Sequence, residues 1–391
     1  MKGKWLFVLI FLFIGILSFA DVVDKYVDAN IVGGNHTGAD WTNAWANLSD
    51  AAAEKVDLVT ATDRWIIHCR ATAETADTEV CLWDAWTCNS SYYVTVQVDE
   101  ADRHDGKWTS TKYRLELSPS SDNGFTINEC KFMHIIGLQF YLNTSNEYKN
   151  LIDINSTQAS DVTKIEKCIF RGNNAGDTYG INVEANGSGS EVQIWNCSFQ
   201  DFYHASSDAA GIKCAAETVI AHNCTAYHNR WGYTQSGGTF TAVNCGSDSH
   251  AVGFNGTIGQ TTCKTTSPSF VSTSGTYDLH LQSGDTAWKD QGTDVSSGAI
   301  GFPDDIDGDT RSGNWDVGAD EVTGAAEWTA HKHVTLGFSM IFAVFGLALN
   351  IFLLVCLYYL SKRLGRLERR ISFFENGDNF EAWYELHKYL E

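Results

Sequence analysis

Side chains that could carry chemistry recur just beyond successive predicted strands in the middle of this 391-residue chain. They are Arg171, Asp201, Tyr203, His204, His228, Arg230, Trp231, Asp248 and His250. Carboxylate, imidazole and guanidinium groups can move protons or hold a cation, and aromatic rings beside them can stack on a ligand. The competing interpretation is a row of ordinary exposed turn residues. If the chain has a catalytic or binding site, these residues are the candidates for it.

An internal repeat between residues 133 and 247 would position these side chains. Five segments show period-two apolar alternation, a one-residue change of phase, and alternation again, which is typical of two strands joined by a tight bend. The first inward residue after each bend is Leu138, Cys168, Cys197, Cys224 or Cys245. The bend residues are Gly137, Lys167, Asn196, Asn223 and Asn244. Glycine and asparagine tolerate positive φ, so only the lysine departs from this turn chemistry.

No single repeat unit can bury its apolar face alone, so the units must stack and share one core. We therefore predict an all-β fold, a right-handed parallel β-helix with its repeat coils over residues 133–250. Equivalent positions on neighbouring coils would lie about 4.8 Å apart, which would gather the candidate residues into one surface column. Strand-like runs over 64–128 extend the solenoid, and helix-compatible apolar spacing over 41–56 predicts a helix that caps its open N-terminal end.

The closing segment, residues 268–321, departs from the repeat and carries its own motifs. A Pro-x-Phe strand and a D-L-x-L strand precede an Asp-Gly-x-x-Arg loop and an Asp-Val-Gly-Ala-Asp-Glu ending. The residues are Pro268, Phe270, Asp278, Leu279, Leu281, Asp307, Gly308, Arg311, Asp316, Val317, Gly318, Ala319 and Glu321. This segment resembles the C-terminal end of bacterial right-handed β-helix proteins of the pectate-lyase-like superfamily, and the opening YVDAN is similar to their N-terminal end. The resemblance covers nearly all of residues 25–321 and implies the fold, but it is a poor guide to activity.

The resemblance implies two kinds of enzyme. A polysaccharide lyase of this superfamily uses carboxylate-bound calcium to neutralise a uronate and a basic residue to remove the adjacent proton. Arg230 would be that base, Asp201 and Asp248 would bind the calcium, and His228 joins the candidate catalytic set. A glycoside hydrolase would instead use the same two aspartates as its carboxylate pair. Paired arginines around a proline, which mark some lyases, do not occur in this sequence.

A glycan-binding surface needs less than either enzyme. Trp231 and Tyr203 would stack on sugar rings. Polar groups that could orient hydroxyls come from Arg171, His204, Asp248 and His250. A surface interaction role, including that of a structural phage or envelope component, requires no catalytic residue. We therefore expect a glycan-binding or surface interaction protein, with a lyase or hydrolase of acidic polysaccharide as the rival.

A possible calcium loop begins with three alternate aspartates: Asp305, Asp307 and Asp309. Thr310 stands where such a loop uses glycine, and Asp316 stands where it uses a bidentate glutamate. The competing interpretation is that Arg311 pairs with carboxylates to close the last coil.

Cysteine usage bears on export, because exported proteins normally form disulfides. Ten of the eleven cysteines precede the C-terminal apolar stretch. The four at inward repeat positions are interpreted as packing residues, since a free cysteine behaves as a small hydrophobe. Cys81 and Cys88, seven residues apart around a polar turn, are the predicted bridge. A zinc site is disfavoured because no close Cys-x-x-Cys pair occurs.

Two terminal stretches predict an exported, single-span membrane protein. Residues 1–20 have a lysine-bearing start, an apolar run and small residues at 18 and 20, as in a cleaved export signal, although an uncleaved anchor would look similar. Residues 334–360 carry no charge and can cross a bilayer, and five Lys or Arg residues follow. The positive-inside rule then places the β-helix domain, 21–325, outside the cytoplasmic membrane. The segment 326–333 is a linker, and the amphipathic tail 361–391 is cytoplasmic.

The tail and the net charge indicate partners. Apolar residues over 360–374 follow heptad spacing, which predicts a homo-oligomer through this helix or its attachment to the lipid surface. Residues 21–330 carry 18 basic and 42 acidic side chains, a formal charge of −24. Such a surface excludes nucleic acid, whose binders are basic. It is compatible with cations such as calcium or with neutral glycans.

Overall fold

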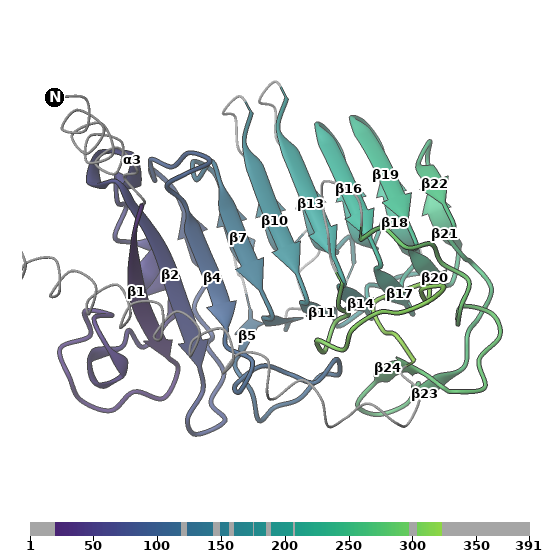
Figure 1. Ribbon diagram of the computed structural model, residues 1–391, viewed down its shortest axis with the longest axis horizontal. Helices are drawn as coiled ribbons and strands as arrows, with labels where there is room; N and C mark the ends of the chain where they lie inside the picture. Colours follow the sequence, from purple (N-terminus) through teal and green to yellow (C-terminus); the bar gives the residue numbers. More distant parts are fainter. Residues whose placement is uncertain are drawn as a thin grey trace, which may run out of the picture. The chain divides into compact units, whose positions relative to one another are not determined.

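Three parallel sheets form the framework of the described chain. The structure, a computed structural model, describes residues 20–118, 123–143, 149–155, 160–174, 176–184, 189–205, 208–296 and 303–322. Each coil passes through the three sheets in turn, and each strand pairs in parallel with its equivalent one coil away (Figure 1). This arrangement confirms the predicted parallel β-helix, while its right-handed sense stays a prediction.

The strands fall into the three sheets in the order of the coils. Sheet 1 contains β1 (Asp21–Asp28), β2 (Asp63–Arg70), β4 (Val94–Val98), β7 (Met133–Ile136), β10 (Val162–Glu166), β13 (Glu191–Trp195), β16 (Thr218–His222), β19 (Thr239–Val243) and β22 (Gly259–Thr261). Sheet 2 contains β5 (Arg114–Leu117), β8 (Gln139–Leu142), β11 (Ile169–Arg171), β14 (Ser198–Gln200), β17 (Thr225–Tyr227) and β20 (Gly246–Asp248). Sheet 3 contains β3 (Cys81–Trp83), β6 (Phe125–Ile127), β9 (Asn150–Ile154), β12 (Tyr179–Val183), β15 (Ala210–Cys214), β18 (Trp231–Gln235) and β21 (Val252–Asn255). The strand-like runs predicted over 64–128 all coincide with strands.

The core is built of columns of like side chains. The rings of Phe140, Phe170 and Phe199 stack at centroid distances of 5.0 and 4.8 Å on successive coils. The five predicted inward anchors that begin with Leu138 are fully buried. Because the coils share these columns, the core is continuous along the solenoid.

The predicted bends between sheets 1 and 2 all adopt positive φ. The values are 71° at Gly137, 53° at Lys167, 50° at Asn196, 49° at Asn223 and 52° at Asn244. The lysine therefore conforms to the column despite its residue type. Main-chain hydrogen bonds to the neighbouring coils hold Lys167 in this conformation. The Lys167 N–H donates to the Trp195 carbonyl on one side, and the Gly137 N–H donates to the Glu166 carbonyl on the other. The register of the coils outweighs the local preference of one residue.

The N-terminal cap differs from the single helix predicted over 41–56. A 3₁₀ turn, η1 (Trp41–Asn43), is followed by α2 (Leu48–Ala52) and α3 (Leu58–Ala61). The helix is interrupted because Trp45 is extended and forms a parallel bridge with Val27 of β1. The Trp45 N–H donates to the Tyr26 carbonyl, and the Trp45 carbonyl accepts from the Asp28 N–H. These bonds pair main-chain groups at the open edge of sheet 1.

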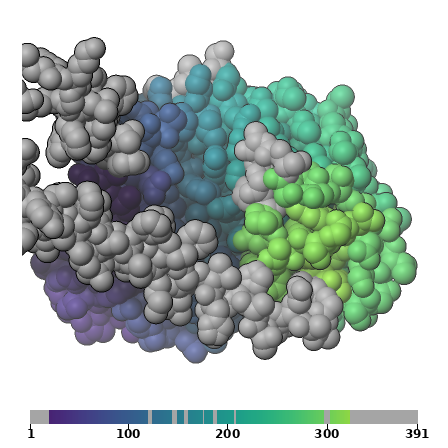
Figure 2. Space-filling model, in the orientation of Figure 1, coloured from purple at the N-terminus to yellow at the C-terminus, as the bar shows by residue number. Residues whose placement is uncertain are grey.

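The segment after residue 268 does not simply close the last coil. It forms an antiparallel pair, β23 (Phe270–Ser272) and β24 (Asp278–Leu281), and then runs back along the bends. Main-chain bonds tie Gly318 to the Asn244 carbonyl and Ala319 to the Thr225 hydroxyl, at 2.8 and 2.9 Å. Figure 2 shows the yellow-green atoms of this part lying on the green coils. We call residues 268–322 the return segment.

The predicted export signal, linker, membrane span and tail fall on residues 1–19 and 323–391, outside the described residues. Within the part of the chain that is described, no helix combines the length and the apolar character that a bilayer crossing requires.

Candidate functional site

The predicted cluster lies where the chain leaves sheet 2. Asp201 follows β14 and His228 follows β17, and both adopt positive φ, 63° and 53°. The strands pair in register up to Gln200 and Tyr227, so the next residues stack coil on coil. The His228 N–H also donates to the Asp248 carbonyl at 3.0 Å. The stacking expected from the repeat therefore brings these turns together.

A buried carboxylate organises this cluster. Asp201 accepts hydrogen bonds from His228 Nδ1 at 2.8 Å and from the Tyr277 hydroxyl at 2.9 Å. Arg171 Nε lies 3.6 Å from the other carboxylate oxygen. Burial, followed by the charge of this carboxylate, raises the pKa of Tyr277 to about 12, so the phenol stays a hydrogen-bond donor. Asp201 is thus positioned to orient the His228 ring.

Three rings meet in front of this carboxylate, and we call Tyr203, His228 and His250 the ring cluster. The Tyr203 and His250 centroids are 4.1 Å apart, and the two imidazole centroids are 4.5 Å apart. His250 is exposed, and its partners are half-buried. Burial and the neighbouring His228 lower the pKa of His250, which favours the neutral ring. The cluster presents fixed aromatic faces to solvent.

Arg230 serves a different purpose from the predicted base. Its Nη1 donates to the carbonyls of His204 and Ala205 at 3.3 and 2.6 Å, and its guanidinium carbon lies 5.4 Å from the Trp231 ring centroid. The guanidinium therefore holds the turn, and the geometry gives its predicted role in proton abstraction no support. Trp231 remains half-buried at the start of β18.

The two aspartates predicted as calcium ligands or as a carboxylate pair make hydrogen bonds to other side chains. Asp248 accepts from the Ser267 hydroxyl at 3.0 Å, whereas Asp201 accepts from His228 and Tyr277.

The phenol of Tyr277 belongs to the site but was not predicted from the sequence. It comes from the return segment, directly before the D-L-x-L motif, and nothing local in the sequence links it to a turn 76 residues away.

A second row of polar groups, also missed, lies on the outer face of sheet 3. Register places Asp153, Asn182 and Lys213 on adjacent strands. The carboxylate accepts from the Asn182 amide at 2.8 Å, and the Lys213 ammonium lies 4.6 Å from the Tyr179 ring centroid. Trp231 pairs with Ala210, which pairs with this tyrosine, so Trp231 and the row belong to the same sheet.

Sheet 1 carries a separate open pocket of about 410 Å³. It is lined by Ser90, Tyr93, Phe132, Met133, His134, Val162, Lys164 and Gln193. His134 Nε2 lies 2.9 Å from a Glu166 carboxylate oxygen, and the Lys164 ammonium lies 5.5 Å from the Trp195 ring centroid. Nothing in the amino-acid sequence predicts this pocket, because its residues resemble the polar face of ordinary strands.

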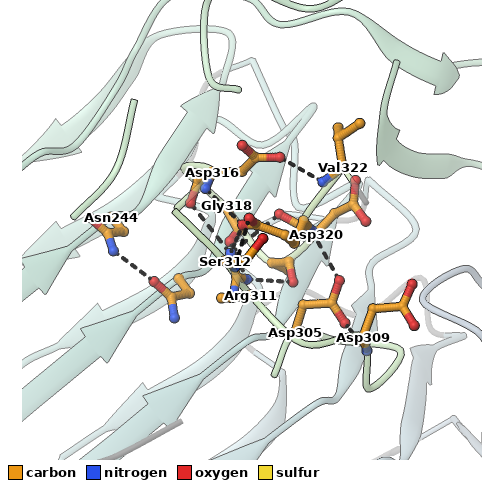
Figure 3. A network of polar contacts seen from close by, with 12 residues as sticks. Asn244, Asp305, Asp309, Arg311, Ser312, Asp316, Gly318, Asp320 and Val322 are labelled. Carbon is orange, nitrogen blue, oxygen red and sulfur yellow. Dashed lines mark hydrogen bonds and ion pairs between the residues drawn. The ribbon is translucent and has the colours of Figure 1, made fainter. Parts of the chain in front are cut away.

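The Arg311 side chain holds the return segment together (Figure 3). It is fully buried, and it lies 3.3 Å from the Glu321 carboxylate. Its Nη2 donates to the carbonyls of Gly318 and Ala319 at 3.0 and 2.8 Å and to Asn196 Oδ1 at 3.2 Å. The expected arginine–carboxylate pair is therefore present, but it clamps the segment onto a bend in the middle of the coils.

The three aspartates predicted to bind calcium do not form a calcium loop. Asp305 Oδ1 accepts from the N–H groups of Asp307, Gly308 and Asp309, and Oδ2 accepts from Glu321 at 3.0 Å. Burial raises the pKa of Asp305. Both of its oxygens are occupied by main-chain donors, so the residue shapes a turn. Among the described residues, His280, Asp307 and Asp320 form the group that could hold a metal ion.

The cysteines are free throughout the described chain, including the pair predicted to form a bridge. Cys88 Sγ lies 3.7 Å from Cys130 Sγ, on the neighbouring coil, and Cys81 belongs to β3. The seven-residue spacing failed as a guide because it spans a turn within one coil, whereas the nearest thiol is one coil away. Cys168, Cys197 and the other inward cysteines are buried, as predicted.

Comparisons with known proteins add little to this geometry. No protein-family model matches the chain. No curated protein is significantly similar to it. Among solved structures, it is similar to one described as the crystal structure of pectate lyase Pel9A, with 12% identity, 78% of this chain and 98% of that chain covered, and a TM-score of 0.30. A similarity this weak carries no argument, so the β-helix assignment rests on the three parallel sheets.

Proposed function

We propose that this chain is a membrane-anchored, extracytoplasmic β-helix protein that binds a neutral glycan at the ring cluster and Trp231. The observation that carries the proposal is the contact of three partly exposed rings, with Tyr203 and His250 at 4.1 Å. Export and anchoring rest on the terminal apolar stretches of the sequence. Self-association through 360–374 belongs to the same proposal.

Preorganisation supports binding at these rings. The Asp201 carboxylate holds the His228 ring through Nδ1, and Arg230 holds the main chain at His204 and Ala205, next to Tyr203. Rings that are already held lose little conformational freedom when a ligand binds, so more of the contact energy appears as affinity. The formal charge of −24 over residues 21–330 opposes an acidic ligand and favours a neutral one.

An enzyme is the rival, and one observation favours it. His228 donates through Nδ1 to a buried carboxylate, which is the arrangement that orients an imidazole as a general base. No hydrogen bond reaches its Nε2 from the described residues. In a lyase of acidic polysaccharide this nitrogen would take the proton, in place of the predicted Arg230.

A glycan array probed with the full-length protein tests the binding proposal. We expect Trp231→Ala and Tyr203→Ala to weaken binding about tenfold each, because an aromatic contact contributes about 1.5 kcal/mol. Tyr93→Ala, in the sheet 1 pocket, is the matched control and should bind as the wild type does. Array binding that survives both turn variants would contradict the proposal.

Ultraviolet absorbance separates the enzyme from the binder. The full-length protein is incubated with acidic polysaccharides, with and without calcium, and the appearance of unsaturated products is followed. New absorbance that disappears in His228→Ala would establish the lyase and overturn a binding-only function. Reducing-sugar release without new absorbance would instead indicate a hydrolase.

A further inference from the structure

Three ligand atoms converge where the return segment meets the coils. One nitrogen of His280 and one carboxylate oxygen each of Asp307 and Asp320 lie within 4.8 Å of one another. The histidine is on β24, and the two aspartates come from opposite ends of the Arg311 turn. None of these residues belongs to the ring cluster.

A fourth residue sets the orientation of the imidazole. His280 Nδ1 lies 2.5 Å from Asp278 Oδ1 and donates its N–H there, so Nε2 is the ring nitrogen on the side of Asp307, where its lone pair could bind an ion. Histidines that bind metals nearly always donate their second ring N–H in this way, often to a carboxylate. The Asp278–His280 pair is therefore the arrangement of a metal-binding histidine and its supporting group.

The spacing of the atoms fits an ion better than a hydrogen bond. His280 Nε2 and Asp307 Oδ2 are 3.5 Å apart, beyond the usual hydrogen-bond distance. Two ligand atoms about 2.1 Å from one tetrahedral ion would be about 3.4 Å apart. Nε2 and Asp307 Oδ1 are also buried without a hydrogen-bond partner among the described residues. Unpartnered buried polar atoms are costly, and an ion between Nε2 and Asp307 Oδ2 would satisfy the nitrogen.

The neighbouring loop packs closely against the imidazole, and only a glycine fits there. Gly106 adopts φ of +77°, and a Cβ at this position would lie 2.3 Å from His280 Nε2. Any side chain there would therefore occupy the position next to the lone pair. The same loop is tied to the return segment by Arg103, whose Nη2 donates to the Asp307 carbonyl at 3.1 Å.

We propose that His280, Asp307 and Asp320 bind a divalent transition-metal ion of the Zn²⁺ class that holds β24 against the rest of the return segment. One imidazole and two carboxylates suit Zn²⁺ and its neighbours. Calcium takes six to eight oxygen ligands, which this mixed set does not provide. The site is structural and shares no residue with the ring cluster.

Metal titration of the full-length protein tests this site. After chelator treatment, we expect calorimetry to detect one Zn²⁺ per chain and no comparable binding of Ca²⁺. His280→Gln and Asp307→Asn should abolish this binding, and Asp278→Asn should weaken it about 10- to 100-fold, as the loss of a supporting group does. Asp294→Asn, an exposed aspartate in the same segment, and His250→Gln are the matched controls and should bind as the wild type does.

A measurement on the unmutated protein guards against variants that fail to fold. Co²⁺ replaces Zn²⁺, and its visible spectrum reports the ligand atoms. Visible Co²⁺ bands typical of nitrogen and oxygen ligands support the proposal if one equivalent of Zn²⁺ removes them. A sulfur-to-cobalt charge-transfer band would assign the ion to the cysteines, and no binding by the wild type at all would leave only an ion-paired cluster. Either result overturns the proposal.

Discussion

The coils and the return segment are stabilised by different kinds of contact. In the coils, the same backbone ladder and the same column of side chains recur, as in the stack from Phe140 to Phe199. In the return segment, single polar residues make contacts that occur once, above all Arg311 with the carbonyls of Gly318 and Ala319. The two regions meet at the bend asparagines.

Because of this difference, a single substitution should destabilise the return segment more than it destabilises a coil. A coil distributes its stability over many equivalent contacts, so its neighbours compensate for one poor residue, as Lys167 at a positive-φ bend illustrates. The return segment concentrates its stability in a few buried charged groups. The same segment also supplies Tyr277 to the candidate binding site, so damage to it should reach the ring cluster.

The largest effect should come from Arg311→Met. The change leaves the buried Glu321 carboxylate and several carbonyls without their donor, which should lower the free energy of unfolding by about 3–5 kcal/mol. Denaturant unfolding measures the loss, and hydrogen exchange should show the return segment opening while the coils stay protected. Lys55→Ala, which breaks an exposed pair with Asp84, is the control at about 1 kcal/mol or less. Equal loss of protection in both regions would contradict the comparison.

A smaller effect should follow from Asn244→Gly, which keeps the backbone freedom that the bend needs. The variant loses the bonds that Asn244 exchanges with Thr293, at 2.8 and 2.9 Å, and should lose about 1–3 kcal/mol of stability in urea unfolding. Asn223→Gly is the matched bend, because the Asn223 side chain bonds to Asn244 and, among the described residues, to no residue of the return segment, and it should cost less. If the two variants cost the same, the asparagines serve only the bend conformation.

The smallest effect is a pH dependence from His104, in the loop between the two regions. Burial, then the charge of Arg103, lowers the pKa of this histidine to about 3, and its ring is held neutral by bonds to Gly106 and Lys167. Below about pH 6.5 His104 binds a proton in the unfolded chain but stays neutral in the folded chain. The free energy of unfolding should therefore fall by up to about 1.4 kcal/mol per pH unit toward pH 3. Urea unfolding from pH 7 to 5 should show a shallower slope for His104→Gln. A wild-type slope in His104→Gln would contradict this account.

The coils could be predicted because a period of two and a repeated bend are local signals. The same repeat explains why Asp201, His228 and His250 could be placed together, since equivalent turns stack. The path of the return segment could not be predicted, because it has no repeat and its contacts span 76 residues from Tyr277 to Asp201 and 115 from Asn196 to Arg311. The bridge between Cys81 and Cys88 failed for the related reason that neighbours in a solenoid are one coil apart.

Histidine NMR of the full-length protein tests the central claim most directly. A glycan selected on the array is titrated into the protein while the imidazole signals are followed. We expect the signals of His228 and His250 to shift with saturation, while those of His68 and His134 on sheet 1 stay in place. Shifts confined to the sheet 1 histidines would place the ligand in the other pocket and contradict binding at the ring cluster.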